Sequence, residues 1–373
     1  MHLLFTRFPL ESRFGGAEVQ TVSLMEGLIE RGHNVQFLGS CQTLLKECRS
    51  RGIKATELHI GPPPVTKWGA ISFFWRKRGM AQRLQHALGE LLSFDAIFML
   101  SLSEKLLLTN EAVSQGIKTI WIEHDRVGRW LTRNPWLPTL LTCSKNVTTV
   151  VVSPLSAKIY EEMGWEKEDI VTIPNGIDER KLQSNTKYEI RNTRYEKKSK
   201  DIPYNLKLGC IARLSKEKGI DLLIHAVKDL SDVSLTIVGT GRDELSLRQM
   251  ITGPLKERIT IVKHIEDIAA FILSLDFLVL PSREHDPFGM VAAEAMLLGK
   301  PVIVTDACGI AGYLRDGIDA KIVKADSQEE LQKAISDLLQ PEIRERIGGE
   351  GQKTAQSLFT LHPMIDRYLE VLS

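Results

Sequence analysis

The sequence has few of the features that mark metal-binding, secreted or membrane-spanning chains. Its five cysteines are scattered, with neither a CxxC pair nor a histidine-rich neighbourhood, which predicts no zinc site and favours reduced, structural thiols. No stretch of about 18 apolar residues occurs, and the apolar start ends at Phe5, too early for a signal peptide. We therefore expect a cytoplasmic protein.

An excess of charge of one sign is also missing. The 48 Lys and Arg residues balance 47 Asp and Glu residues, for a formal net charge of +1. Such a chain has no general attraction for nucleic acid or anionic lipid, so any basic surface for a partner must be local. At 373 residues the chain exceeds the length of about 250 to 300 at which single cores stop growing, so we expect two domains.

Short apolar runs alternate with amphipathic helical segments along the chain. The segment 17–31, for example, carries an apolar stripe and ends at Gly32, a typical helix terminator. Strand–helix–strand alternation predicts a parallel sheet, and the pattern restarts after a polar stretch, so the predicted fold class is α/β with two doubly wound sheets. The predicted strands are 3–5, 35–38, 96–100, 119–122 and 147–152, then 206–212, 234–238, 259–262, 277–280, 302–304 and 321–323.

We place the N-terminal domain at residues 1–177 and the C-terminal domain at 178–356. The beginning of the second domain, about 178–204, is charged and has few apolar residues, which indicates a linker or a surface excursion. A final helix at about 357–373 carries an apolar stripe that includes Ile365, Tyr368 and Leu372. This stripe needs a surface to pack on.

Ligands of open α/β sheets bind beyond the carboxyl ends of the strands, so candidate residues should follow strands. Gly15 and Gly16 follow the first strand and open a helix, where backbone N–H groups can bind a phosphate; a plain tight turn explains the pair equally well. His124 follows a strand in the same domain and could donate a hydrogen bond to a substrate oxygen, although lone histidines are more often structural.

The second domain has a cationic loop after its first strand. Arg213 and Lys218 there would neutralise a diphosphate, or else belong to a solvated basic loop. The segments around Thr240, Ile265 and 174–178 read first as turns and only second as ligand contacts.

Two carboxylates follow a later strand of the second domain. Asp286 precedes a helix that we expect to begin near Phe288, and Glu294 lies eight residues further on, a spacing that places both toward one side. The two acids would bind a ligand; alternatively, Asp286 caps the helix and Glu294 binds a neighbouring loop.

Taken in chain order, these segments resemble glycosyltransferase family 4, a large retaining family with the GT-B fold of two Rossmann-like domains facing across a cleft. The resemblance spans nearly the whole chain. The family's pattern has two glutamates separated by seven residues; here Asp286, one methylene shorter, takes the first place and Glu294 the second. The matching segments are 15–18, 124–125, 174–178, Arg213 with 218–219, 238–241 and 286–301.

The resemblance implies transfer of a hexose from a UDP- or GDP-linked sugar to a glycan or lipid-linked glycan, with retention of configuration. It implies no metal ion or other cofactor, and no two aspartates of the chain are spaced as Asp-x-Asp. The final helix is expected to cross back onto the N-terminal domain. The residues implied in catalysis are His124, Arg213, Lys218 and Asp286, and those implied in donor binding are Gly15, Gly16, Thr240, Ile265, Phe288, Gly289, Met290 and Glu294.

Aromatic residues and cations are mixed in the stretch that starts at Lys67 and ends at Arg78, and again near Trp130 and Trp136. Either stretch could lie peripherally on the inner face of an anionic membrane, with a lipopolysaccharide-type glycan as acceptor. The other interpretation, slightly favoured for the second stretch, is that the aromatics belong to the core and the cations to its rim. No nucleic-acid partner is expected.

Two other functions remain open. A sugar-nucleotide epimerase can be built on the GT-B architecture and would release an epimeric sugar without an acceptor. A catalytically silent subunit that binds a nucleotide sugar is the second alternative, since the family's first glutamate is replaced by Asp286. A nicotinamide dehydrogenase fits poorly, because neither half contains GxGxxG with an acid about 20 residues later.

Overall fold

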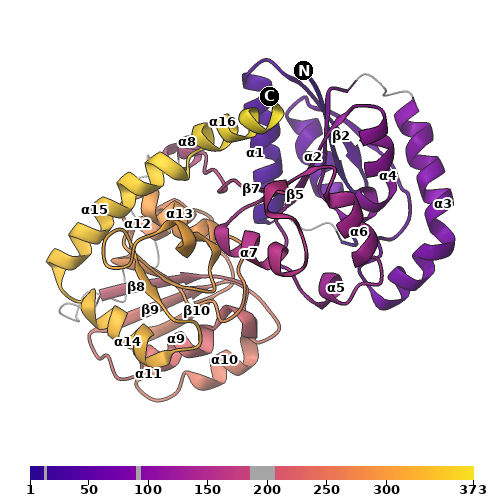
Figure 1. Cartoon of the computed structure of the whole chain (residues 1–373). Coiled ribbons are helices and arrows are strands. Elements are labelled where there is room, and N and C mark those ends of the chain that lie inside the picture. The colour runs from indigo at the N-terminus through magenta and orange to yellow at the C-terminus, as the bar shows by residue number, and fades with distance from the viewer. Residues whose placement is uncertain (12–14, 90–93, 185–205) are drawn as a thin grey trace. The chain divides into compact units, whose positions relative to one another are not determined.

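The computed structural model describes residues 1–11, 15–89, 94–184 and 206–373. It divides into two compact units: unit 1 comprises Met1–Gly176 and Leu361–Ser373, and unit 2 comprises Ile177–Thr360. The charged region predicted at about 178–204 falls largely outside the described residues, apart from α8 (Glu179–Ser184). Figure 1 shows a sheet flanked by helices in each unit. No described helix is both long and apolar enough to cross a bilayer.

The described part of unit 1 contains a seven-stranded sheet in the order β3-β2-β1-β4-β5-β6-β7, with all neighbours parallel. The chain order reverses between β1 and β4, which is the switch point of a doubly wound sheet. Most of these strands are buried on both faces, which explains their continuous apolar runs. The strands are β1 (His2–Arg7), β2 (Asn34–Gly39), β3 (Lys54–Glu57), β4 (Ala96–Met99), β5 (Lys118–Glu123), β6 (Thr148–Val151) and β7 (Ile170–Thr172).

Helices cover both faces of the sheet of unit 1. One face shares its apolar core with α1, α2 and α16, and the other face shares its core with α3, α4, α6 and α7. The helices are α1 (Gly16–Glu30), α2 (Gln42–Ser50), α3 (Lys67–Gly89), α4 (Leu102–Ser114), α5 (Arg129–Thr132), α6 (Leu137–Ser144), α7 (Pro154–Glu162) and α16 (Leu361–Leu372).

The C-terminal helix α16 packs on α1, although more than 300 residues separate them in the chain. The Tyr368 ring lies edge-on to Phe98 of β4, at 6.2 Å between centroids. A Cβ atom at Gly27 would lie 2.0 Å from Cδ1 of Ile365, so only glycine allows this close approach of the two helices. The apolar stripe of the final helix therefore belongs to the core of unit 1.

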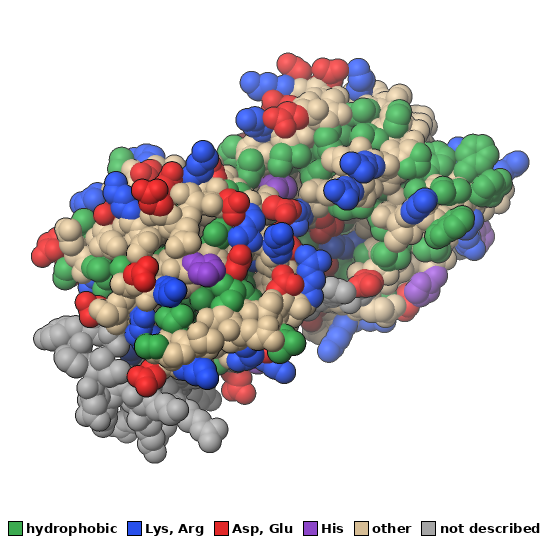
Figure 2. Space-filling view, turned by 90° about the horizontal axis from the view of Figure 1, so that it is seen from below, with side chains coloured by type: hydrophobic (Ala, Val, Ile, Leu, Met, Phe, Trp, Pro, Cys, Tyr) green, Lys and Arg blue, Asp and Glu red, His purple; other side chains and the backbone are tan. Residues whose placement is uncertain are grey.

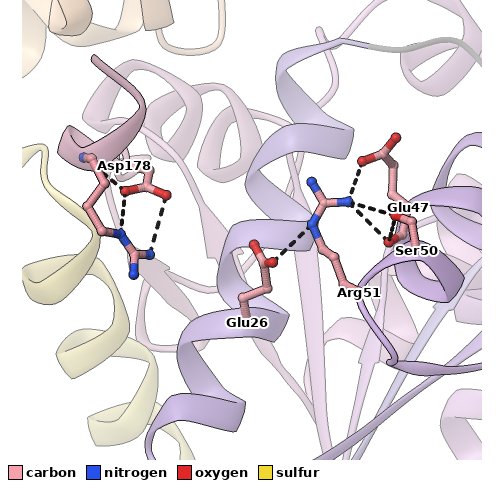
Figure 3. A network of polar contacts seen from close by, with 6 residues as sticks. Glu26, Glu47, Ser50, Arg51 and Asp178 are labelled. Carbon is pink, nitrogen blue, oxygen red and sulfur yellow. Dashed lines mark hydrogen bonds and ion pairs between the residues drawn. The ribbon is translucent and has the colours of Figure 1, made fainter. Parts of the chain in front are cut away.

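An arginine network fixes α1 against α2 at the surface (Figure 3). The Arg51 guanidinium donates from Nε to Glu26 of α1 at 2.9 Å and from Nη1 to the Glu47 carboxylate and backbone oxygen of α2. Arg51 thus satisfies carbonyl and carboxylate oxygens on two helices with one planar group, as only arginine can do. The network contains none of the predicted site residues, and we assign it to stability.

The described part of unit 2 contains a six-stranded parallel sheet in the order β10-β9-β8-β11-β12-β13, with its own switch point between β8 and β11. This repeats the strand order of unit 1 without its seventh strand, and both are Rossmann-like. The strands are β8 (Leu206–Ile211), β9 (Val233–Val238), β10 (Ile259–Val262), β11 (Phe277–Leu280), β12 (Val302–Thr305) and β13 (Lys321–Val323).

Helices again cover both faces of the sheet of unit 2. The core on one face includes residues of α9, α10, α11 and α14, while α13 contacts β11, β12 and α15. The helices are α9 (Ile220–Val227), α10 (Glu244–Met250), α11 (Leu255–Arg258), α12 (Ile268–Leu273), α13 (Met290–Leu297), α14 (Gln328–Asp337) and α15 (Pro341–Leu358).

The prediction of two doubly wound α/β sheets is confirmed, with three differences. The strands β3 and β7 were not predicted, because β3 is a largely exposed edge strand of sequence KATE and β7 is only half-buried. Helix α13 begins at Met290, two residues after the expected start at Phe288. The predicted final helix is separated from α15 by a short break and begins at Leu361.

Candidate functional site

The switch point of unit 2 brings together two of the predicted site residues. The loop after β8 carries Lys218, and the loop after β11 carries Asp286; the two strands are neighbours in the sheet. Lys218 Nζ donates to Asp286 Oδ2 at 2.5 Å, and both side chains are largely buried. The structure therefore places a cation and a carboxylate where doubly wound folds bind ligands.

The backbone on both sides holds Asp286 in place. Its N–H donates to Ala307 O at 2.9 Å, and its carbonyl oxygen accepts from the N–H of Gly309 at 2.8 Å. Ser282 Oγ also donates to Oδ2, at 3.2 Å, so this oxygen has two donors. The other oxygen, Oδ1, accepts from no residue that the structure describes, and it remains available to a ligand.

The N-terminus of α13 presents free donors beside Asp286. The N–H groups of Phe288, Gly289 and Met290 have no acceptor among the described residues. Gly289 adopts a φ of 100°, and a Cβ atom there would lie 2.6 Å from Cys308 Sγ, so the turn requires glycine. The Phe288 ring is buried against other aromatic rings, so its backbone and not its side chain can meet a ligand.

Glu294 lies on α13, and its carboxyl group has no hydrogen bond or ion pair with any described residue; only its backbone oxygen accepts, from Leu298 N–H at 3.2 Å. Burial raises the pKa of its carboxyl to about 7, because the ionised form loses hydration without gaining a partner. Asp286 lies four residues before α13 starts and Glu294 lies on it, so the expectation that both carboxylates lie toward one side stays a prediction. A half-buried acid without a partner remains a strong candidate for ligand contact.

The remaining predicted residues of unit 2 lie on adjacent loops. Arg213 and Thr240 are exposed, and the Thr240 carbonyl accepts from Leu214 N–H at 2.9 Å. At Gly239, with φ 150°, a Cβ atom would lie 2.0 Å from Ala212 O, so the loops after β8 and β9 touch through their backbones. Ile265 is half-buried after β10. Among the described residues, no hydrogen bond or ion pair joins the side chains of Arg213, Thr240 or Ile265 to Lys218 or Asp286.

In unit 1 the glycine pair forms the start of α1. Gly15 is the N-cap residue in an extended conformation, and Gly16 is the first helical residue. The N–H groups of the first turn, from Gly16 to Glu18, have no acceptor among the described residues, as an anion site requires. Glu18 itself is buried and pairs with Arg7, at the end of β1, at 2.7 Å. This pair places a further cation near the helix start.

His124 follows β5 directly, and its Nδ1 is buried without a partner among the described residues. Burial, together with the charges of Arg7 and Lys105, lowers the pKa of His124 to about 3. The imidazole is therefore neutral at physiological pH and can both donate and accept a hydrogen bond. Lys105 is itself buried and pairs with Glu123, the residue before His124, at 2.6 Å.

Three charged residues near the predicted positions were not anticipated: Arg7, Lys105 and Arg283. Arg7 stands at the end of a strand before the glycine pair, a position that could have been noticed in the sequence. Lys105 and Arg283 could not be noticed in this way, because their partners, Glu123 and Asp221, are far away in the chain. Within the described ranges, no group of three or more His, Cys, Asp or Glu residues is placed to hold a metal ion, and all five cysteines are buried and free.

Two family models match the chain, one on each half. Residues 14–181 match the model described as Glycosyltransferase Family 4, and residues 193–354 match the model described as Glycosyl transferases group 1. The chain belongs to the family 4 glycosyltransferases. The resemblance seen in the sequence is thereby confirmed.

Similar proteins give the same result. The lipopolysaccharide core biosynthesis glycosyltransferase LpsE of Rhizobium meliloti is 26% identical over 63% of this chain and 67% of its own length. A phosphatidyl-myo-inositol mannosyltransferase of Mycobacterium leprae is 30% identical over 57% of this chain and 55% of its own length. The chain thus spans about two thirds or less of these curated relatives.

Solved structures support the GT-B fold over the whole chain. HepE of Anabaena, crystallised with UDP, superimposes with a TM-score of 0.79 and 19% identity, covering 100% of this chain and 99% of its own. At this identity the likeness establishes the fold alone.

Proposed function

We propose that this glycosyltransferase moves a hexose from a UDP- or GDP-linked sugar to a glycan or lipid-linked glycan, with retention of configuration and without a metal ion or other cofactor. The observation that carries the proposal is the group formed by Lys218, Asp286 and the free N–H donors of α13 at the switch point of unit 2. A diphosphate needs cations and N–H donors, and a sugar needs a carboxylate oxygen, and these groups supply both.

The chemistry requires stabilisation of negative charge on the leaving diphosphate as the sugar becomes oxocarbenium-like. Lys218, Arg213 and the positive end of the α13 dipole would provide that charge without a metal. Glu294 would accept hydrogen bonds from the ribose hydroxyls, which explains why its carboxyl has no protein partner. In unit 1, Gly16 would contribute N–H groups to a phosphate and neutral His124 would contact the hexose.

The relatives are consistent with this assignment. LpsE acts in lipopolysaccharide core biosynthesis, the Mycobacterium leprae relative transfers mannose to a phosphatidyl-inositol, and HepE was crystallised with UDP. We therefore propose a polysaccharide or lipopolysaccharide-type acceptor for this chain, and a place at the cytoplasmic face of the membrane.

The anomer of the released sugar tests the proposal. The purified chain, in EDTA, is incubated with α-linked UDP- and GDP-hexoses, and the anomeric protons of free hexose are followed by NMR from the first minutes. We expect slow hydrolysis that yields the α-anomer first, because water replaces the acceptor with retention. Release of the β-anomer first, or activity only after a metal ion is added, would contradict the mechanism. Release of a 2-epimeric sugar would indicate an epimerase. Tight nucleotide binding without any turnover would indicate a silent subunit.

The acceptor side of the proposal includes a membrane surface on α3. This 23-residue helix contains no Asp or Glu, although the chain as a whole is neutral. Its buried side is formed by Phe73, Met80 and Leu84, and the opposite side exposes apolar residues to solvent. The exposed fractions are 77% for Trp68, 41% for Ile71, 61% for Phe74 and 73% for Trp75.

Cations surround these exposed side chains. Lys67, Lys77 and Arg78 are exposed, and Lys77 Nζ lies 5.0 Å from the Trp136 ring. Figure 2 shows hydrophobic side chains mixed with Lys and Arg at the end of unit 1 where Figure 1 places α3. Exposed tryptophans flanked by cations, with no acid between them, fit an anionic bilayer surface.

The second aromatic stretch, near Trp130 and Trp136, packs against α3. Trp136 donates from Nε1 to Ala70 O at 2.8 Å, and its ring contacts both Phe73 and Phe74. Asn134 Nδ2 donates to Pro64 O at 2.7 Å, just before the helix. This stretch therefore anchors α3, in agreement with the preferred interpretation of its aromatics as partly core.

Sedimentation with vesicles tests the membrane contact. We expect binding to phosphatidylcholine vesicles that contain phosphatidylglycerol, weakened at least about tenfold in Trp68→Ala/Trp75→Ala, since each buried tryptophan contributes a few kcal/mol. Leu245→Ala, which removes an exposed apolar residue of unit 2, is the matched control and should bind like wild type. Equal binding by the double variant and wild type, or none by wild type, overturns this part of the proposal.

A further inference from the structure

Two loops of unit 2 must keep a fixed spacing if the proposed donor site is to be preformed. The loop after β8 contains the short turn Lys216–Lys218, and the loop after β11 runs from Pro281 to Asp286. The backbones touch directly, since a Cβ atom at Gly219, with φ 64°, would lie 2.0 Å from Pro281 O. The N–H groups of Arg283 and Glu284 both donate to Glu217 O, at 2.8 and 3.2 Å.

The Arg283 side chain continues this contact in three directions. Its Nη1 donates to Lys216 O at 2.9 Å, and Nη1 and Nη2 bind the two oxygens of Asp221, on the first turn of α9, at 3.1 and 2.8 Å. Its Nε donates to Asp326, in the turn after β13, at 2.6 Å. The guanidinium thus joins the two site loops to the start of α9 and to a third loop.

One partner of Arg283, Asp326, has an unusual backbone conformation. Asp326 is the only non-glycine residue in the described part of the chain with a positive φ, at 63°. An aspartate tolerates this conformation better than most residues but still at some cost. The side chain of Arg283 is 16% exposed, while Asp221 is 38% and Asp326 64% exposed, so solvent screens the pair with Asp221 less than the pair with Asp326.

We propose that Arg283 is a positioning residue that fixes Lys218 against Asp286 before the donor binds. The inference rests on the proposed function, because it takes the pair of Lys218 and Asp286 as the site of the diphosphate. Arg283 has no hydrogen bond or ion pair with Lys218 or Asp286; it holds the backbone of the loop that carries Lys218. Without Arg283, the binding of a diphosphate would also have to order that lysine, which lowers the affinity. The nucleoside part of the donor does not bind Lys218, so the affinity for the nucleoside alone should not change when Arg283 is replaced.

The test compares a diphosphate with its own nucleoside. Calorimetric titrations with UDP and uridine, or the pair for whichever base wild type selects, are made on wild type, Arg283→Met, Arg283→Lys and Asp326→Asn. The control is Arg258→Met, which removes an arginine that also makes several hydrogen bonds, to backbone oxygens between the end of α9 and the first residue of β9. Hydrogen exchange of peptides covering 214–222 is measured in parallel and needs no ligand.

We expect Arg283→Met to bind the diphosphate about tenfold more weakly, with the nucleoside affinity changed less than about twofold. Arg283→Lys should recover part of the loss, since lysine keeps the charge but lacks the planar fork. Asp326→Asn keeps the backbone conformation but removes the charge, and its affinity for the diphosphate should be about two- to threefold lower than that of wild type. The segment 214–222 should exchange faster in Arg283→Met and not in Arg258→Met.

If Arg283→Met loses as much affinity for the nucleoside as for the diphosphate, Arg283 has a merely structural role and the inference is overturned. The same conclusion follows if Arg258→Met loses as much diphosphate affinity as Arg283→Met. Unchanged exchange of 214–222 in Arg283→Met would overturn it as well. If wild type binds no nucleoside diphosphate, the proposed function fails, and the exchange result still decides whether Arg283 holds the loop.

Discussion

The unpartnered carboxyl of Glu294 predicts a variant that is more stable than wild type and yet inactive. Its pKa in the folded chain is about 7, compared with its ordinary value of 4.5, because burial penalises the ionised form. Between these two pH values the folded chain binds more protons than the unfolded chain. The stability of the wild type should therefore fall as the pH rises from about 4.5 to 7 and stay level above that.

The size of the effect follows from the two pKa values. A pKa difference of one unit between the folded and unfolded chain corresponds to about 1.4 kcal/mol. The rise from 4.5 to about 7 therefore means that ionised Glu294 lowers the folding stability above pH 7 by about 3 kcal/mol, as an order of magnitude. Glu294→Gln keeps the shape of the side chain and removes its charge. It should therefore match wild type near pH 4 and exceed its stability by up to about 3 kcal/mol at pH 8.

Urea unfolding at pH 4, 6 and 8, followed by circular dichroism, measures this difference. Glu257→Gln, at an exposed position, serves as the matched control. A Glu294→Gln variant that is no more stable than wild type at pH 8, or a difference that is constant with pH, would refute the reasoning. Nucleotide affinity should fall in the same variant, because an acid kept at a stability cost is retained for a ligand.

Further predictions concern single residues of each unit. The pKa of His124 is lowered to about 3, so its carbon-bound ring protons should show constant NMR shifts from pH 8 to 5; a titration near pH 6.5 would contradict the structure. Tyr368→Ala should destabilise unit 1 by about 3 to 5 kcal/mol in urea, since the ring is buried on Phe98; no loss would argue against the packing of α16. Gly239→Ala should lower the melting temperature of unit 2, because its Cβ would meet Ala212 O at 2.0 Å, while Gly349→Ala, in open space, should not.

The sequence predicts the α/β architecture because buried parallel strands leave continuous apolar runs. The exceptions show the limits of that signal: β3 is exposed and polar, and β7 is short and half-buried. The stripe of α16 is also evident from spacing, since Ile365, Tyr368 and Leu372 recur on one side of a helix.

The predicted site residues stay predictions, but their placement shows which arguments carry weight. Position after a strand was informative, because it selected Lys218 and Asp286, which the sheet order then brings into contact. The spacing of eight between Asp286 and Glu294 includes the turn at Gly289, before α13 begins, and the placement of both carboxylates toward one side stays a prediction. The partnerships of Arg283 with Asp221 and Asp326 join residues that are 62 and 43 positions apart in the chain, and no local pattern reveals them.

The most direct test of the donor site is a titration in EDTA. Wild type and Glu294→Ala are titrated with UDP, GDP and ADP and with their hexose conjugates. We predict that wild type selects one nucleotide, that EDTA does not abolish binding, and that Glu294→Ala weakens it strongly. Binding of no nucleotide by wild type, or full affinity in Glu294→Ala, would contradict the assignment of this site as the donor site.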